Sequence, residues 1–176
     1  VLSGDGGSAI LAALGGEPQG LAIGGNGTLY ITAPEAGRIR QMILPYGAPA
    51  IEVTASPVIL WPPSHHKVTI NLTVSQIDGD PTSGITLESV TSSEADDAPG
   101  EGDGRTVGDI QNADIGTLDT ALSLRAERSS NGPGRSYVIT YRIDDSSGRT
   151  ARASAVVYVP QNKASGVDPL QMTLSQ

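Results

Sequence analysis

The sequence contains no cysteine and no phenylalanine, and aromatic residues make up only 3% of its 176 positions. The absence of cysteine excludes disulfides, thiolate zinc sites, iron–sulfur clusters and covalent haem attachment. A core without phenylalanine has to be built from Val, Ile, Leu and Ala, with Trp61 and five tyrosines as its only large rings. We therefore expect a thin hydrophobic core, and for Trp61 we favour a place in that core over a ligand-stacking role.

Basic residues are also scarce: 11 Lys and Arg stand against 19 Asp and Glu, for a formal net charge of −8. Binding to nucleic acid needs clustered Lys and Arg that neutralise phosphates, and no such cluster occurs, so we expect no nucleic-acid partner. Acidity also disfavours anionic membranes, and no apolar run approaches the length that crosses a bilayer, so we expect no membrane insertion. An acidic surface instead suits high solubility or divalent cations.

Three regions differ in composition, and the 22 glycines and 12 prolines favour short strands separated by turns. Residues 1–46 are rich in glycine with short apolar bursts. Residues 47–160 carry long alternating runs, and residues 161–176 form a polar tail that ends in a short alternating stretch at 170–174. We take these regions as an N-terminal segment, a main domain and a tail with a possible short strand.

The main domain alternates apolar and other residues with a period of two, which predicts half-buried antiparallel strands. The positions expected to face inward include Val68, Ile70, Leu72, Val74, Tyr137, Ile139, Tyr141, Ile143, Ala153, Ala155, Val157 and Val159. A helical pattern is confined to residues 8–14. The chain is therefore predicted to be all-β, and about seven strands over roughly 110 residues are typical of an immunoglobulin-like β-sandwich.

The densest charged stretch runs from Asp78 to Asp119 and holds eleven acids against one base, Arg105. Carboxylates gathered in a Gly/Pro loop repel one another unless a cation lies among them, and calcium accepts such flexible oxygen ligands. The candidate calcium ligands are Glu94, Asp96, Asp97, Glu101 and Asp103, together with Asp78 and Asp80. The alternative is a solvated acidic loop. The pair Asp144 and Asp145 could line a second site.

Other charged residues favour structural roles over chemistry. His65 and His66 are adjacent, and neighbours in an extended segment point to opposite sides, so we interpret them as polar residues of a turn rather than metal ligands. Arg125 and Glu127 share one face of a strand, which favours an ion pair. The motifs of serine hydrolases, zinc peptidases and phosphate-binding loops are all missing, so we expect no enzyme activity.

Residues 4–41 resemble one NHL repeat, the blade unit of a β-propeller. The residues that carry the resemblance are Gly4–Gly7, Leu14, Pro18, Gly20–Ala22, Gly27–Ile31 and Arg38–Arg40. The resemblance implies successive antiparallel strands. Ala33 stands where the family usually has Asp, so the turn between strands can differ.

Residues 58–160 resemble a bacterial extracellular Ig-like module. The matching residues are Leu60–Pro63, His66, Lys67, Ser89–Ser93, Glu94, Asp96, Gly102–Gly104, Leu124–Ser129, Gly134, Arg135, Tyr137–Tyr141 and Asp144–Gly148. Two departures are Ser64-His65 before His66 and Gly79 near the place of a family cysteine, so a disulfide of some relatives is absent. The resemblance implies the fold and a secreted or cell-surface location, with which a processed start at Val1 would agree. It implies no catalysis.

A single blade cannot bury its own faces, because propellers close with several blades. The segment 1–46 must therefore be completed by an upstream propeller, by its own Ig-like domain, or by a neighbouring subunit. We accordingly expect a non-enzymatic extracellular structural subunit that associates through open strand edges into a fibre or larger complex. The alternatives are a calcium-dependent adhesive module that binds glycan or protein, and a passive spacer domain.

Overall fold

The structure is a computed structural model that describes residues 4, 6–15, 17–24, 28–43, 47–79, 83–98 and 101–163, without the side chains of Ile10 and Glu101. The chain divides into two compact units, Val1–Gly47 and Ala48–Gln176, next to the boundary predicted between the first two regions. The short strand predicted at 170–174 lies outside the described residues. In the part of the chain that the structure describes, no helix is long and apolar enough to cross a membrane.

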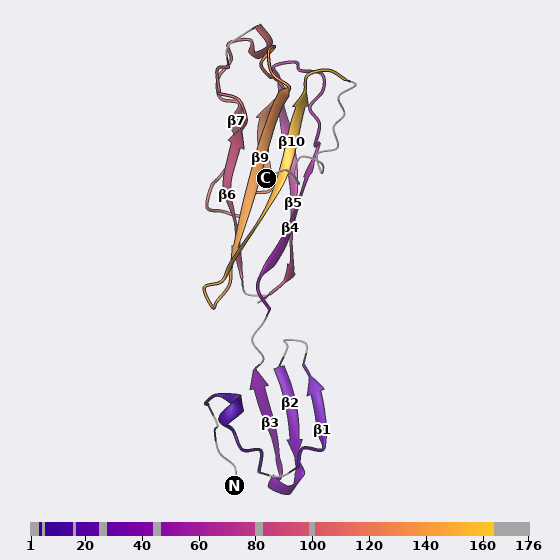
Figure 1. Cartoon of the computed structure of the whole chain (residues 1–176), viewed down its shortest axis with the longest axis vertical. Coiled ribbons are helices and arrows are strands. Elements are labelled where there is room, and N and C mark those ends of the chain that lie inside the picture. The colour runs from indigo at the N-terminus through magenta and orange to yellow at the C-terminus, as the bar shows by residue number, and fades with distance from the viewer. Residues whose placement is uncertain are drawn as a thin grey trace. The chain divides into compact units, whose positions relative to one another are not determined.

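The N-terminal unit contains one small antiparallel sheet with the strand order β1-β2-β3 (Figure 1). Its elements are the 3-10 turn η1 (Ala9–Leu11), β1 (Gly20–Ile23), β2 (Thr28–Ala33), the 3-10 turn η2 (Pro34–Ala36) and β3 (Arg38–Ile43). The helical pattern noted over residues 8–14 thus forms a single 3-10 turn. Gly37 ends η2 with a left-handed φ of 64°, which turns the chain into β3.

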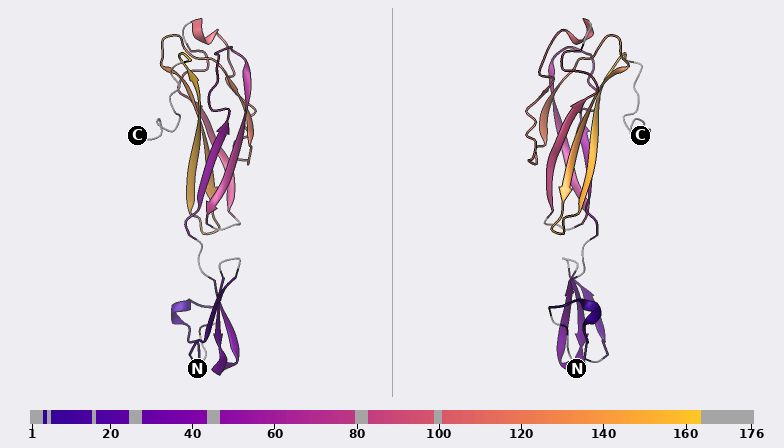
Figure 2. Two further views of the ribbon diagram at one scale, coloured as in Figure 1. Left: turned by 90° about the vertical axis from the view of Figure 1, so that its right-hand side faces the viewer. Right: turned by 60° about the vertical axis from the view of Figure 1, so that its left-hand side comes forward.

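The described residues of the second unit form a two-sheet β-sandwich of seven strands, as the alternation predicted (Figures 1 and 2). One sheet has the order β10-β9-β6 and the other the order β4-β5-β8-β7, and the paired strands run antiparallel. The elements are β4 (Ala50–Ser56), β5 (Lys67–Asp78), β6 (Gly84–Ser92), the 3-10 turn η3 (Glu101–Asp103), β7 (Ile110–Gln111), β8 (Ala121–Arg125), β9 (Gly134–Asp144) and β10 (Thr150–Pro160). The all-β fold class is therefore confirmed.

The core lies between the two sheets and follows the period-two pattern. Four apolar inward residues of β9 are fully buried, and Ile70 of β5 and Leu124 of β8 face them from the other sheet. The β9 residues are Tyr137, Ile139, Tyr141 and Ile143. Burial of such side chains stabilises the fold by roughly 1.5–3 kcal/mol each, so strand alternation alone is sufficient to set which faces meet.

Trp61 is not part of this core, so the prediction that it fills the core is wrong. Its side chain is 40% exposed, whereas the preceding Leu60 is 2% exposed. The cause is the backbone: the Leu60 N–H donates to the carbonyl of Tyr158, and Ile59 forms a parallel bridge with the same residue. This extended segment turns Leu60 inward, and its neighbour therefore points outward.

Candidate functional site

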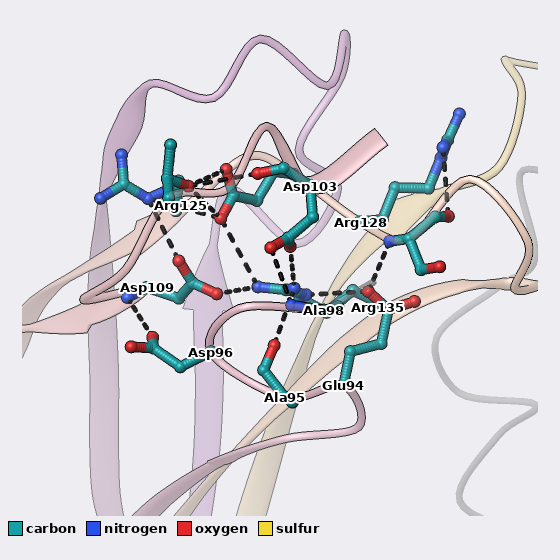
Figure 3. Close-up of polar contacts among 12 residues, drawn as sticks. Glu94, Ala95, Asp96, Ala98, Asp103, Asp109, Arg125, Arg128 and Arg135 are labelled. Carbon is teal, nitrogen blue, oxygen red and sulfur yellow. Dashed lines mark hydrogen bonds and ion pairs between the residues drawn. The ribbon is translucent and has the colours of Figure 1, made fainter. Parts of the chain in front are cut away.

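A fully buried arginine, Arg135, organises one end of the sandwich (Figure 3). All five of its N–H groups have an acceptor, which is the full donor capacity of a guanidinium group. Nε donates to Glu94 Oε2 (3.1 Å), one terminal nitrogen donates to Asp109 Oδ2 and to the Tyr137 hydroxyl (3.2 Å), and the other donates to Asp103 Oδ1 (2.5 Å) and the Ala95 carbonyl (3.2 Å). Burial is costly for a charge, and this complete set of partners offsets the cost.

The strand register explains how an arginine comes to lie inside. Arg135 is the second residue of β9 and has the same parity as Tyr137 and Ile139, so it points toward the core. The Tyr137 hydroxyl accepts from Arg135 and donates to the carbonyl of Arg125 (2.9 Å), and burial raises the pKa of Tyr137 to about 12. Burial by itself would lower the pKa of Arg135, but the hydrogen bonds with Tyr137, Glu94 and Asp109 raise it above its usual value.

Asp109 joins Arg135 to a second arginine. Its Oδ1 accepts from Arg125 Nε at 3.1 Å, while its Oδ2 accepts from Arg135. Arg125 also donates to the carbonyls of His65 (3.0 Å) and Val107 (2.8 Å). The Asp109 carboxylate therefore links the end of β8 to the start of β9. Arg125 extends this network by hydrogen-bonding the segments that lead into β5 and β7.

Glu127 is the fourth buried or nearly buried carboxylate of this network, and its side chain is fully buried. The Thr106 hydroxyl donates to it (2.6 Å to Oε1), and His65 Nδ1 lies 3.1 Å from Oε2. Arg125 Nε is 3.5 Å away, within ion-pair distance, so the pairing expected between Arg125 and Glu127 is confirmed. Burial raises the pKa of Glu127, the neighbouring Asp109 raises it further, and the contacts with Thr106 and His65 oppose the rise.

The acidic loop that follows β6 is ordered by hydrogen bonds within the chain. Glu94 Oε2 also accepts from the Ser129 N–H (2.7 Å), and Asp103 Oδ2 accepts from the Ala98 N–H (2.8 Å). Asp96 accepts from the N–H groups of Gly108 and Asp109, both at 2.8 Å, and these bonds lower the pKa of Asp96. The loop carboxylates thus face arginine and backbone donors instead of solvent alone.

The residues predicted as calcium ligands do not all come together. Glu94 and Asp103 bond to Arg135, whereas Asp96 and Asp97 are both exposed, and among the described residues Asp96 accepts only from the backbone N–H groups of Gly108 and Asp109. Asp78 lies at the far end of β5 from Lys67 and accepts from the N–H of Gly79 (2.7 Å). Asp80 and the side chain of Glu101 fall outside the described residues.

Three buried carboxylates nevertheless could hold a metal ion. Asp103, Asp109 and Glu127 each offer one oxygen, and these oxygens lie within 4.8 Å of one another. Together with Glu94 they make four carboxylates around two guanidinium groups, so acids outnumber arginines in the network. Burial raises the pKa of Asp103, although the charge of Arg135 opposes this. A bound proton or an additional cation would each reduce this excess of negative charge.

Asp144 and Asp145, the pair suggested from the sequence as lining a second site, also accept hydrogen bonds from groups of the chain itself. Asp144 accepts from Arg142 (2.9 Å) and from the Thr150 hydroxyl (2.6 Å). Asp145 accepts from Arg149 Nε (2.6 Å) and from two backbone N–H groups. These hydrogen bonds of Asp144 and Asp145 stabilise the turn between β9 and β10.

The sequence analysis predicted the pair of Arg125 and Glu127 but assigned neither Arg135 nor Asp109 to a site. Arg135 could have been found by its parity, since it occupies an inward position of an otherwise apolar face. Glu127 shares a face with Arg125, a relation that the alternation did reveal. Asp109 carries no local signal, because its partners are 16 and 26 residues away in the chain.

Replacing Glu127 with glutamine is expected to remove a loss of stability that the wild-type chain undergoes as the pH rises above 4.5. The folded pKa of Glu127 lies above its ordinary value of 4.5. Between those two values the folded state holds a proton that the unfolded chain has released, so the free energy of unfolding falls as the pH rises through this window. Glutamine has no such proton. Urea titrations at pH 4.5 and at stepwise higher pH measure the slope.

Asp103→Asn is the comparison for that substitution rather than a neutral control, because burial raises the pKa of Asp103 too, so its own proton adds to the fall in stability as the pH rises. Each oxygen of Asp103 accepts from a different N–H donor, Arg135 or Ala98, so an amide NH₂ would face a donor in either orientation. We expect a cost of about 1–3 kcal/mol from the unsatisfied group. The lowered pKa of Asp96 also makes the stability depend on pH, but in a different range. Asp96 stabilises the fold fully above its ordinary pKa of 3.8, and this contribution is lost as the pH falls below that value, outside the window assigned to Glu127. An unchanged slope in the Glu127→Gln variant would contradict the assignment.

Comparison with known proteins adds no family, relative or neighbour to this description. No family model, no curated protein and no solved structure matches the chain. The geometry of the chain itself is therefore the basis on which its function can be inferred.

Proposed function

We propose that the chain is a non-enzymatic structural subunit of an extracellular assembly, and that its N-terminal sheet is the surface through which it associates. The observation that carries the proposal is that this three-stranded sheet exposes apolar side chains on both faces. The extracellular location is part of the proposal and rests on the resemblance of residues 58–160 to secreted modules.

The strand register assigns the exposed side chains to the two faces. Leu21 and Ile23 of β1 are 69% and 72% exposed, and they share a face with the residues opposite them, Ile31 and Leu29. Ile39 and Ile43 of β3 are 70% and 77% exposed and lie on the other face. Tyr30 and Ala22 belong to that second face as well. Sheets that are apolar on both sides are normally covered on both sides.

The small size of the sheet strengthens this inference. Three strands with little cover are marginally stable in water. The edge strand β1 has only four residues, and within the described sheet it pairs only with β2. A second copy of this sheet could cover an apolar face or extend an edge by strand addition. Self-association is therefore the interaction that we propose.

The sandwich supports a structural role in a different way. Its buried acids and arginines take part in internal hydrogen bonds, and all five donors of Arg135 are satisfied. Such a network holds the loops of one end of the sandwich together. We therefore assign the network to rigidity.

The N-terminal sheet is expected to make the 18.0 kDa chain self-associate. Light scattering on the purified chain should give a mass of a dimer or more, and Ile23→Asp together with Ile39→Asp should reduce it to the monomer, because a charge on either apolar face opposes burial. The matched control is Ile77→Asp, since Ile77 is 65% exposed on the sandwich. A monomeric wild-type chain would contradict association and favour the passive spacer.

A second candidate function, a calcium-dependent binding module, is favoured by the group of Asp103, Asp109 and Glu127. Its donors have the oxygen chemistry that calcium prefers. However, Asp103 and Asp109 already accept from Arg135, so an ion would compete with a buried guanidinium group. If calcium is the resident cation, a chelator should loosen the assembly and lower the thermal midpoint in the same light-scattering series. If the arginines suffice, the chelator should change neither.

A further inference from the structure

A shallow pocket of about 410 Å³ lies beside the Arg135 network. One wall is the segment after β6, residues 93–98, and the other is the turn before β9, residues 129–134. It is distinct from the N-terminal sheet, and nothing in the proposed assembly uses it. Its walls combine apolar groups, from Ala95, Ala98 and Pro133, with the polar groups of Glu94 and the turn.

Glu94 contributes a carboxylate that is held at one oxygen and open at the other. Oε2 accepts from the Ser129 N–H (2.7 Å) and from Arg135 Nε (3.1 Å), which fixes the side chain. Oε1 accepts no hydrogen bond from the residues that the structure describes. It faces Gly132, where a Cβ atom would lie 3.2 Å from it. The absence of a side chain at Gly132 therefore leaves Oε1 accessible from the pocket.

The negative charge of the residues around the pocket determines whether a cation or an anion binds there. Behind Glu94 lie three more carboxylates, Asp103, Asp109 and Glu127, with only two guanidinium groups among the four acids. Arg128, near the rim, donates its guanidinium N–H groups to the carbonyls of Ser129, Pro160 and Gln161, and Figure 3 shows that it points away from the network. The excess negative charge favours a cation at Oε1.

We propose that this pocket binds the cationic side chain of a lysine or arginine on a partner polypeptide. The ammonium or guanidinium group donates to Glu94 Oε1. The methylene stem lies against Ala95, Ala98 and Pro133, in the way that long basic side chains cover apolar surface. Charge-assisted hydrogen bonds of this kind are stronger than neutral ones, and they give the pocket its preference for charge.

The test is an NMR titration of the 1–176 chain with Nα-acetyl-lysine methylamide, a blocked lysine. The amide signals of Ser129, Gly132 and Gly134 are expected to shift and to saturate. The same compound acetylated at Nε is neutral and should bind about tenfold more weakly, as the loss of one charged hydrogen bond predicts. n-Butylamine should also bind more weakly, because it lacks peptide groups that can hydrogen-bond the turn.

Gly132→Ala is the diagnostic variant, because its methyl group crowds Oε1 without touching Arg135. Gly132 has no left-handed φ, so alanine fits its backbone, and the blocked lysine should bind about tenfold more weakly while the thermal midpoint stays unchanged. Gly84→Ala is the matched control, since a Cβ there meets nothing within 4 Å; it should bind as the wild type does.

Several outcomes would overturn the proposal. They are equal binding of the charged and neutral probes, unaltered binding in Gly132→Ala, and saturating shifts with calcium chloride but none with the blocked lysine. Equal binding of n-butylamine and the blocked lysine would assign the pocket to free amines and overturn the polypeptide partner. The test is independent of self-association, since a variant with charged N-terminal sheet residues should bind the probe equally well.

Discussion

Replacing Arg135 with methionine is expected to lower the free energy of unfolding by about 3–5 kcal/mol, the usual cost of removing one partner from a buried ion network. Methionine fills much of the volume but donates no hydrogen bond. Glu94, Asp103 and Asp109 would then be left close together at the end of the sandwich without their shared cation. The Tyr137 hydroxyl would lose one partner too. Urea unfolding followed by tyrosine and tryptophan fluorescence measures the loss.

Two further variants separate the network from a general effect of removing charge. Arg135→Lys keeps the charge but has three donors in place of five, so it should recover only part of the stability. Arg152→Ala breaks an ion pair with Glu88 in which the arginine side chain is 53% exposed, and it should lower the stability far less, because water screens an exposed pair. Equal losses for Arg135→Met and Arg152→Ala would show that the buried network contributes nothing special to stability.

Replacing Gly134 with alanine is expected to cost about 2–5 kcal/mol through combined backbone strain and steric overlap. Gly134 begins β9 with a φ of 126°, a conformation that residues with a side chain rarely adopt. An added Cβ would lie 2.6 Å from the Tyr158 hydroxyl and 2.6 Å from the Val159 carbonyl oxygen. The first β9–β10 pair would have to open, and the position of the adjacent Arg135 would shift with it.

Gly148→Ala is the matched control for that substitution. Gly148 also has a positive φ, 78°, but a Cβ there meets nothing within 4 Å, so only the conformational cost of about 1–2 kcal/mol should appear. Thermal unfolding of both variants gives the comparison. A Gly134→Ala variant no less stable than Gly148→Ala would show that the close approach of Tyr158 and Val159 relaxes freely.

The sandwich could be predicted because its signal is local. Apolar residues recur at every second position over Val68–Val74 of β5, Tyr137–Ile143 of β9 and Ala151–Val159 of β10, and burial of one face follows from that spacing once any second sheet is available. The place of Trp61 was instead predicted from the scarcity of large rings, and that prediction was wrong, although the preceding Leu60 fills the core. The parity of an isolated segment depends on which neighbour it hydrogen-bonds, and for this segment the neighbour is Tyr158, 98 positions later.

The amino-acid sequence by itself determined that the chain is an acidic, cysteine-free all-β protein with a crowded group of carboxylates. Only the tertiary structure decided what those carboxylates face. Glu94 meets Arg135 through the pairing of β6 with β9 in one sheet, whereas Asp109 and Glu127 flank strands of the other sheet and meet Arg135 only after the two sheets have packed. Electrostatic attraction over a few ångströms depends on position in space, whereas strand alternation depends on position in the chain. For that reason the sequence revealed the acidic loop but did not reveal that Arg135 is the cation with which its carboxylates pair.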